Sequence, residues 1–215
     1  MTKHNPNTGR FWDVYLTSTS DVVGIDFITE DRINLAASLI PNERIKILDI
    51  GAGYGFLEKV LQKKDQVSIF GIDISPKGVI RLRNNFTGFF LIGTAISLPI
   101  AGNSFDYVCL MEVLEHLYSN EGRNALAEIK RVLKQDGRLI ISVPLYDRVY
   151  KNHPSRHVRF YTPELAFSEL NAMGFEVINK MPLYAFSRHY KLKSLLARIF
   201  RLRRPNNLII FARKK

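Results

Sequence analysis

Short apolar runs alternate with helical patterns at close spacing through most of this chain of 215 residues. Five of these runs indicate buried strands, because each is apolar or β-branched and is bounded by turn residues: 45–50, 66–73, 89–95, 105–111 and 138–144. Helical patterns stand between them, at 54–64, after Ser75-Pro76 and at 121–133. This alternation is typical of a mostly parallel sheet with helices on both faces. The chain is therefore predicted to be an α/β, Rossmann-like domain.

The C-terminal part departs from the alternation. A helix beginning at Thr162-Pro163 is followed by two predicted strands, FEVINKM at 175–181 and NLIIFARK at 207–214, which flank an insert and are expected to pair antiparallel. A chain of this length supports one sizeable core. We expect one domain over 1–215, made of an N-terminal helical cap (1–44), a ligand-binding core (45–180) and an inserted basic amphipathic helix (185–204).

The positive charge is confined to the C-terminal segment. The net charge is +11, and residues 1–179 contain 20 basic and 20 acidic groups, so the excess comes from eleven basic residues in 180–215. Leucines recur at helical spacing within 185–204, which is compatible either with binding to an anionic membrane surface or with an insert that caps a pocket.

The single cysteine, Cys109, excludes an intrachain disulfide. The first residues lack the apolar core of a signal peptide, so a cytoplasmic location is expected, with peripheral membrane contact as an option.

A glycine-rich loop follows the first predicted strand. Residues 49–56 read DIGAGYGF, and the second strand ends in an acid, Asp73. Glycines allow a tight turn and close approach of the backbone to a ligand, while an acid at the second strand's end can accept both hydroxyls of a ribose. The dinucleotide fingerprint would require glycine or alanine where Phe56 stands. A nucleoside ligand without phosphates and with an ammonium group fits better, and Asp49 would act on that cation through loop geometry and water.

Five segments carry a resemblance to a known family: ILDIGAGYG, GIDIS, AISLPIAGNSFDYVCLMEVLEHL, IKRVLKQDGRLIISVP and RFYTPELAFSELNAMGFEV. Over residues 45–180 the chain resembles class I S-adenosylmethionine-dependent methyltransferases of the small-molecule type, the methyltransferase type 11 family, which includes quinone-biosynthesis enzymes. The resemblance implies S-adenosyl-L-methionine as the cofactor. It also implies a small-molecule or lipid-like acceptor, methylated by in-line displacement.

The resemblance also implies roles for individual residues. The loop residues Gly51, Ala52, Gly53 and Gly55 would line the methionine and the ribose, Asp73 would bind the ribose hydroxyls, Ile74 would pack on adenine, and Met111 would lie near the sulfonium. Many relatives carry an aspartate where this chain has Thr94. Adenine recognition would then depend on the Thr94 hydroxyl, on the backbone of Ala95 and on apolar contact from Ile74 and Ile96.

Methyl transfer from a sulfonium needs alignment more than a reactive protein group, and alignment alone can supply about 7–11 kcal/mol. No metal is therefore expected, and His153 and His157 are separated by a helix-breaking Pro154. A base is needed only for an acidic acceptor. His116 and Glu112 are the catalytic candidates. The structural alternative for His116 is a hydrogen-bonded residue at the start of a helix, and for Glu112 it is a solvated position on the first helical turn.

An aromatic cluster of Phe11, Trp12 and Tyr15 either closes over the cofactor or packs in the core.

Three other functions stay open. An RNA methyltransferase would explain the basic charge, although the Asp/Asn-Pro-Pro-aromatic turn of amino-methylating DNA enzymes is replaced here by Leu110-Met111-Glu112-Val113. A nicotinamide-dependent dehydrogenase is disfavoured by Phe56. A non-catalytic binding module could retain the fold and attach through 185–204. Neither the acceptor atom nor the oligomeric state follows from the sequence.

Overall fold

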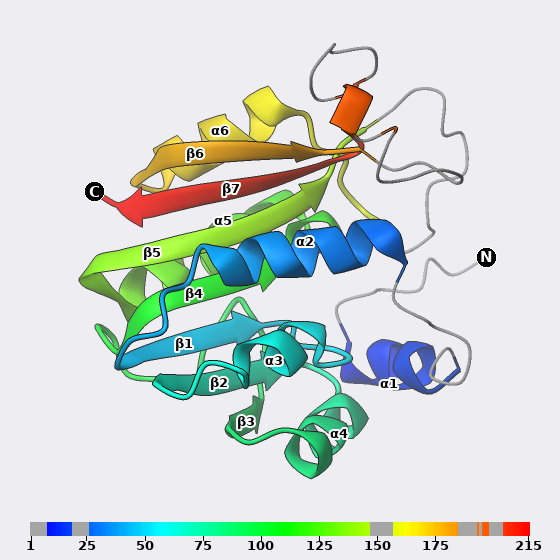
Figure 1. Cartoon of the computed structure of the whole chain (residues 1–215), viewed down its shortest axis with the longest axis vertical. Coiled ribbons are helices and arrows are strands. Elements are labelled where there is room, and N and C mark those ends of the chain that lie inside the picture. The colour runs from blue at the N-terminus through cyan, green and yellow to red at the C-terminus, as the bar shows by residue number, and fades with distance from the viewer. Residues whose placement is uncertain (1–7, 19–25, 147–156, 185–192, 194, 198–203) are drawn as a thin grey trace.

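The computed structural model describes residues 8–18, 26–146, 157–184, 193, 195–197 and 204–215. Its centre is one seven-stranded sheet with the order β3-β2-β1-β4-β5-β7-β6 (Figure 1). The strands are β1 (Ile45–Ile50), β2 (Val67–Asp73), β3 (Phe89–Ile92), β4 (Phe105–Met111), β5 (Leu133–Pro144), β6 (Phe175–Leu183) and β7 (Asn207–Lys214). Neighbours among β1 to β5 are parallel, whereas β7 runs antiparallel to both β5 and β6. The predicted α/β class and the antiparallel C-terminal strand are confirmed.

Helices cover both faces of the sheet. They are α1 (Gly9–Ser18), α2 (Phe27–Ser38), α3 (Phe56–Leu61), α4 (Pro76–Asn85), α5 (Ser119–Val132) and α6 (Pro163–Ala172), with a short 3₁₀ helix η1 (Leu114–His116). Buried side chains of α2, α3 and α4 join one apolar cluster, and those of α5 and α6 join the other. Figure 1 shows α2 and α3 in front of the sheet and α5 behind it. Two apolar layers therefore sandwich the strands.

Local sequence signals set several boundaries as predicted. The Ser75 hydroxyl accepts a hydrogen bond from the Gly78 N–H at the start of α4, and the Thr162 hydroxyl does the same for Leu165 at the start of α6. Both caps precede a proline in the first turn. Gly174 takes the left-handed conformation (φ +80°) that ends α6.

Other boundaries differ from the prediction. The helix expected over 54–64 is confined to Phe56–Leu61, because Gly55 is left-handed (φ +77°) and directly precedes its first turn. The strand expected to reach residue 95 ends at Ile92, where a turn closes with Ser97 N–H donating to the Thr94 carbonyl. Conversely, β5 begins at Leu133, earlier than expected, directly after α5. The first two differences arise where a backbone turn interrupts an apolar pattern, whereas β5 extends over polar residues that carry no strand signal.

The order of the strands places a crevice at a defined point. From β1 the chain proceeds outward to β2 and β3 and then returns to β4 on the other side of β1. In open α/β sheets, ligands bind at the carboxyl ends of the strands where the order reverses in this way. Here the glycine loop follows β1, Asp73 ends β2 and Met111 ends β4. Helix α1 lies near this edge in Figure 1.

The predicted basic amphipathic helix at 185–204 falls mostly outside the described residues. Of that segment, only Lys193, residues 195–197 and Arg204 are described. Leu195 and Leu196 are 53% and 38% exposed, whereas Ala197 is buried. Within the part of the chain that is described, no helix has the length and apolar character needed to cross a membrane.

Candidate functional site

A cavity of about 290 Å³ occupies the crevice at the carboxyl ends of β1, β2 and β4. Its walls come from the glycine loop, the ends of β2 and β4, the turn after β3 and the helices α1 and α2. Of the predicted site residues, eleven line it: Asp49, Gly51, Ala52, Gly53, Asp73, Ile74, Thr94, Ala95, Met111, Glu112 and His116. Gly55 and Ile96 do not line it. The cavity also has walls that the motifs did not indicate, from Leu16, Thr29, Arg32 and Ile33.

At the first and last glycines of the glycine loop, Gly51 and Gly55, the backbone conformation and the close neighbours favour a residue without a side chain. Gly51 has φ +78°, and a Cβ there would lie 2.6 Å from a Val113 methyl carbon. A Cβ on Gly55 would lie 2.2 Å from the Phe86 ring, so Gly55 serves the packing of the loop rather than the cavity wall. Between them, the Gly53 N–H donates a 2.8 Å hydrogen bond to Asp73 Oδ2. The loop is thereby fixed against the end of β2.

Asp73 is a buried carboxylate held by backbone donors. Besides Gly53, the Ser75 N–H donates to Asp73 Oδ1 at 2.8 Å, and the residue is 5% exposed. Burial raises its pKa, while the hydrogen bonds from Ser75 and Gly53 oppose that rise. These contacts fix the orientation of the carboxylate at the cavity wall, where it can accept hydrogen bonds from a ligand's paired hydroxyls.

A second carboxyl pair lies beneath the loop. Asp49 is 4% exposed and Glu58, in the first turn of α3, is fully buried. Burial raises the pKa of Asp49 to about 7, the neighbouring Glu58 carboxyl opposes the rise, and the charge of Asp73 adds to it. Burial, and then the charge of Asp49, raise the pKa of Glu58 well above its usual range. Burial thus disfavours the charged form of both carboxyls, and the charge of a neighbouring carboxylate, Asp73 for Asp49 and Asp49 for Glu58, adds to this effect. Asp49 Oδ1 has no hydrogen-bond partner within the described part of the chain.

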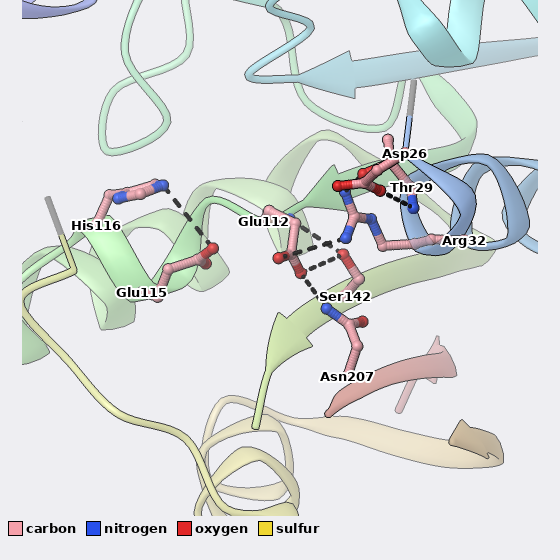
Figure 2. A network of polar contacts seen from close by, with 8 residues as sticks. All are labelled: Asp26, Thr29, Arg32, Glu112, Glu115, His116, Ser142 and Asn207. Atoms are coloured by element: carbon pink, nitrogen blue, oxygen red, sulfur yellow. Dashed lines mark hydrogen bonds and ion pairs between the residues drawn. The ribbon is translucent and has the colours of Figure 1, made fainter. Parts of the chain in front are cut away.

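Glu112 joins elements from opposite ends of the chain (Figure 2). Its carboxylate accepts hydrogen bonds from the Ser142 hydroxyl (3.0 Å) and the Asn207 amide (2.9 Å), and it lies 3.5 Å from Arg32 Nη1. Its backbone has φ +57°, which is uncommon for a side chain of this size. The Glu112 N–H also bonds to Ser142. Glu112 faces the cavity, but its carboxylate is engaged on several sides, which favours a positioning role over that of a free base.

Arg32 is a site residue that the sequence motifs missed. It lines the cavity from α2, and its side chain is 12% exposed. Nη2 donates to the Thr29 hydroxyl at 3.3 Å, while Nε is buried without a hydrogen-bond partner among the described residues. Its only sequence signal is a position on a predicted helix near the loop. A guanidinium at the cavity wall with such a donor can bind an anionic group of a ligand.

His116 lies where η1 meets α1. Its ring packs edge-on against Trp12 (centroids 4.9 Å apart) and against His157 (5.1 Å), and Nε2 lies 3.8 Å from Glu115 Oε1 (Figure 2). His116 lines the cavity. The structure thus brings His116 to the same cavity as the glycine loop and the Asp73 carboxylate.

Helix α1 covers one side of the cavity with two of the three predicted aromatic residues. Trp12 and Tyr15 line the cavity and contact each other edge-on, whereas Phe11 only packs against Trp12. Asp13 attaches the helix to the start of α4, because it accepts hydrogen bonds from the Ser75 hydroxyl and from the Lys77 N–H.

Cys109 and the other predicted loop residues lie apart from this chemistry. Cys109 is fully buried in β4, and burial raises its pKa well above the usual range, so it is an apolar core residue. His153 lies outside the described residues. The Tyr161 hydroxyl donates to Glu169, which also pairs with Arg159, and neither Tyr161 nor Arg159 lines the cavity.

Comparison with known proteins gives a partial match to one family. Residues 48–141 match the family described as a methyltransferase domain. An O-methyltransferase of Penicillium expansum is 28% identical over 187 residues, which cover 80% of this chain and 66% of that protein. A ubiquinone biosynthesis O-methyltransferase of Azorhizobium caulinodans is 27% identical over 160 residues, 66% of this chain and 63% of that protein. The chain thus spans about two thirds of the length of these two relatives.

The fold agrees with that match. The crystal structure of the [4+2]-cyclase SpnF superposes with a TM-score of 0.76 at 20% identity, covering 98% of this chain and 96% of that one, which is a likeness of fold. The matched domain contains the glycine loop, Asp73 and Met111, each placed at the cavity by the strand order. On this match and this architecture, residues 48–141 are similar to methyltransferase domains and lie within a Rossmann-like fold.

Proposed function

We propose that this enzyme binds S-adenosylmethionine in the cavity at the β1–β4 crevice and transfers its methyl group to a small or lipid-like acceptor. The observation that carries the proposal is the set of charges on one cavity: the Asp73 carboxylate beside the glycine loop, and the Asp49 carboxyl and the Arg32 guanidinium on the same walls. A nucleoside that carries an amino acid has hydroxyls, an ammonium and a carboxylate to match these three groups.

The residues present fit the cofactor. Asp73 would accept the ribose hydroxyls, and Asp49 and Arg32, each with a buried polar atom that lacks a partner in the described structure, would face the ammonium and the carboxylate. Ile74, Thr94 and Ala95 would hold adenine, and Met111 would lie near the sulfonium. Gly51 and Gly53 line the cavity where a side chain would intrude on the ligand.

The chain's own residues would align the reactants and exclude water. When bound, S-adenosylmethionine supplies an electrophilic methyl group: the acceptor's lone pair forms the new bond, and the carbon–sulfur pair returns to sulfur as S-adenosylhomocysteine is released. Trp12 and Tyr15 would cover the sulfonium side. Glu112 would hold Arg32, and His116 would accept the acceptor's proton if the acceptor is acidic.

Two observations support an apolar or lipid-like acceptor. Apolar side chains line the same cavity as His116, among them Leu16, Val113 and Leu117. The two relatives above are an O-methyltransferase and a ubiquinone biosynthesis O-methyltransferase. An aromatic or quinol-like hydroxyl compound is thus the first class to test.

Calorimetry with two nucleosides tests cofactor binding. S-adenosylhomocysteine should bind wild-type protein, and Gly53→Arg should abolish binding because the arginine side chain would occupy the cavity that Gly53 lines. Arg32→Ala should weaken the binding of S-adenosylhomocysteine by about tenfold, the value of one charge-assisted hydrogen bond. The same variant should bind 5′-methylthioadenosine, which lacks the carboxylate, as tightly as wild type does. The exposed Asp136→Asn is the control. A wild-type protein that binds neither nucleoside would contradict the proposal.

An acceptor panel tests the reaction. Phenols, quinols, short-chain lipids and RNA would be incubated with S-adenosylmethionine, and products read by mass spectrometry. A methylated hydroxyl compound supports the proposal. A product on RNA alone would favour an RNA methyltransferase, and a protein that binds cofactor but methylates nothing would favour a binding module.

A further inference from the structure

Three side chains with metal-binding atoms meet beside the cavity. One ligand atom from each of Glu115, His116 and His157 lies within 4.8 Å of the other two. No sequence motif indicates this group, because His157 lies far from the other two residues in the chain. We propose that these residues bind a divalent transition-metal ion.

The backbone holds the two parts of the group together. Glu115 and His116 are neighbours on η1, with His116 Nε2 3.8 Å from Glu115 Oε1 (Figure 2). The Glu115 carbonyl accepts hydrogen bonds from the Val158 N–H (2.9 Å) and the Arg159 N–H (3.1 Å). These bonds hold the backbone directly after His157 against η1, which keeps the three side chains close to one another.

The chemistry of the group fits a borderline metal. Two imidazoles and one carboxylate form a ligand set used for catalytic zinc and for other first-row divalent ions, with an open position left for a substrate. Metal–nitrogen bonds of about 2.1 Å in a tetrahedral site place ligand atoms about 3.4 Å apart. Glu115 Oε1 and His116 Nε2 are 3.8 Å apart, and no pair of ligand atoms is separated by more than 4.8 Å, so rotation of the partly exposed His157 ring can complete the approach.

Burial favours an ion at this position. The Glu115 side chain is 1% exposed and that of His116 is 10% exposed. A carboxylate removed from water is stabilised by cations or donors close to it. A divalent ion between the imidazoles and Glu115 would be such a cation, placed where the three ligand atoms already lie close together.

The position of the ion would define the acceptor, an inference that rests on the proposed function. His116 lines the cavity, whereas Glu115 and His157 do not, so the ion's open position would face the methyl acceptor through the wall at His116. An acceptor hydroxyl bound there has a lowered pKa and releases its proton to water. Its oxygen then forms the bond to the methyl carbon as the carbon–sulfur bond breaks. The favoured acceptor is therefore a phenol, enol or quinol, and His116 would be a ligand rather than the base.

Cobalt absorption tests the site without relying on activity. Full-length protein, stripped with a chelator, would be titrated with Co²⁺. Visible bands that saturate at one equivalent and disappear on adding Zn²⁺ are expected. Since loss of even an outer-shell group costs about 10–100-fold in metal affinity, His157→Ala should weaken Co²⁺ binding by at least about 100-fold. Glu128→Gln, a carboxylate remote from the group that pairs with Arg131, should bind as wild type does.

Parallel titration with S-adenosylhomocysteine separates this inference from the proposed function. It also shows that His157→Ala, at a partly exposed position, is folded. Wild type that binds the nucleoside but gives no cobalt bands, or a His157→Ala variant with unchanged bands, overturns the metal site and leaves the methyltransferase with His116 as its base. Cobalt bands without nucleoside binding would instead support the metal site and contradict the proposed cofactor site.

Discussion

At the residue scale, Asp49 sits at the border between its neutral and charged forms. A strand-end carboxyl beneath a glycine loop is readable from sequence, but its partner Glu58 was not indicated by any motif. The two meet because the tight loop returns the first turn of α3 over the end of β1. Burial raises the pKa of Asp49 to about 7. Its ionisation at neutral pH would therefore be linked both to stability and to binding of a cationic ligand.

Replacing Asp49 by asparagine should stabilise the protein increasingly as pH rises. The folded pKa, about 7, lies above the ordinary value of 3.8, so between these values the folded chain holds a proton that the unfolded chain has released. The wild-type free energy of unfolding therefore falls as pH rises from about 4 to about 7. Asp49→Asn avoids this loss and should gain on the order of 1–4 kcal/mol at pH 8 relative to pH 5. Urea denaturation at both pH values measures it.

The exposed Asp136→Asn is the matched control for this measurement, since it makes the same substitution at the surface. It should change the free energy of unfolding about equally at the two pH values. An equal effect of Asp49→Asn at pH 5 and pH 8 would show that the carboxyl is not perturbed as described.

Glu112 marks the limit of sequence reasoning at this scale. Its place after β4 made it a candidate base, and the structure does bring it to the cavity. However, its hydrogen-bond partners Ser142 and Asn207 lie 30 and 95 residues further along the chain. Contacts of this separation have no local signature, so neither the hydrogen bonds of Glu112 nor the ion pair with Arg32 was predictable.

At the element scale, local chemistry predicted caps and loops better than ends of strands. Ser75 and Thr162 act where they were expected to, since a cap depends on residues within one turn. The third strand was expected to include Thr94 and Ala95, which instead form a turn at the cavity. Apolar character alone does not distinguish a strand from a buried turn.

Helix α1 offers a direct test of how the cavity is closed. Asp13→Ala removes two of the hydrogen bonds that attach α1 to α4 and leaves the one from Arg81 to the Leu16 carbonyl, so the helix should leave the cavity more readily. At about 1 kcal/mol for each bond, S-adenosylhomocysteine should dissociate roughly 5- to 30-fold faster. Trp12 is the chain's only tryptophan and lines the cavity, so stopped-flow fluorescence reports the event directly.

Glu30→Ala serves as the comparison for α1, because it removes an exposed acid from the neighbouring α2. Its dissociation rate should match that of wild type. If Asp13→Ala also left the rate unchanged, the attachment of α1 would not control release from the cavity.

At the scale of the whole molecule, the sheet was predictable because each buried parallel strand carries its own apolar signal. The part of the site at the strand ends was predictable, since the carboxyl ends of parallel strands lie at one edge of the sheet regardless of the loop conformations. What escaped prediction depends on elements remote in sequence: Arg32 on α2, and His157 beside Glu115. Their placement follows from the packing of whole helices and segments rather than from any short pattern.

The uneven charge of the chain predicts its behaviour at membranes. All of the +11 excess comes from residues 180–215, so this segment should bind anionic vesicles in low salt and release them in high salt. Each basic group near such a surface contributes about 1 kcal/mol. Replacing Arg201, Arg203 and Arg204 by glutamine should therefore weaken co-sedimentation by roughly 100-fold at 50 mM salt. Replacing Lys59, Lys63 and Arg123, which are exposed on α3, near its end and on α5, lowers the net charge equally but should have little effect. Equal losses in the two triple variants would mean that total charge decides binding, and the C-terminal segment would then have no special part in it.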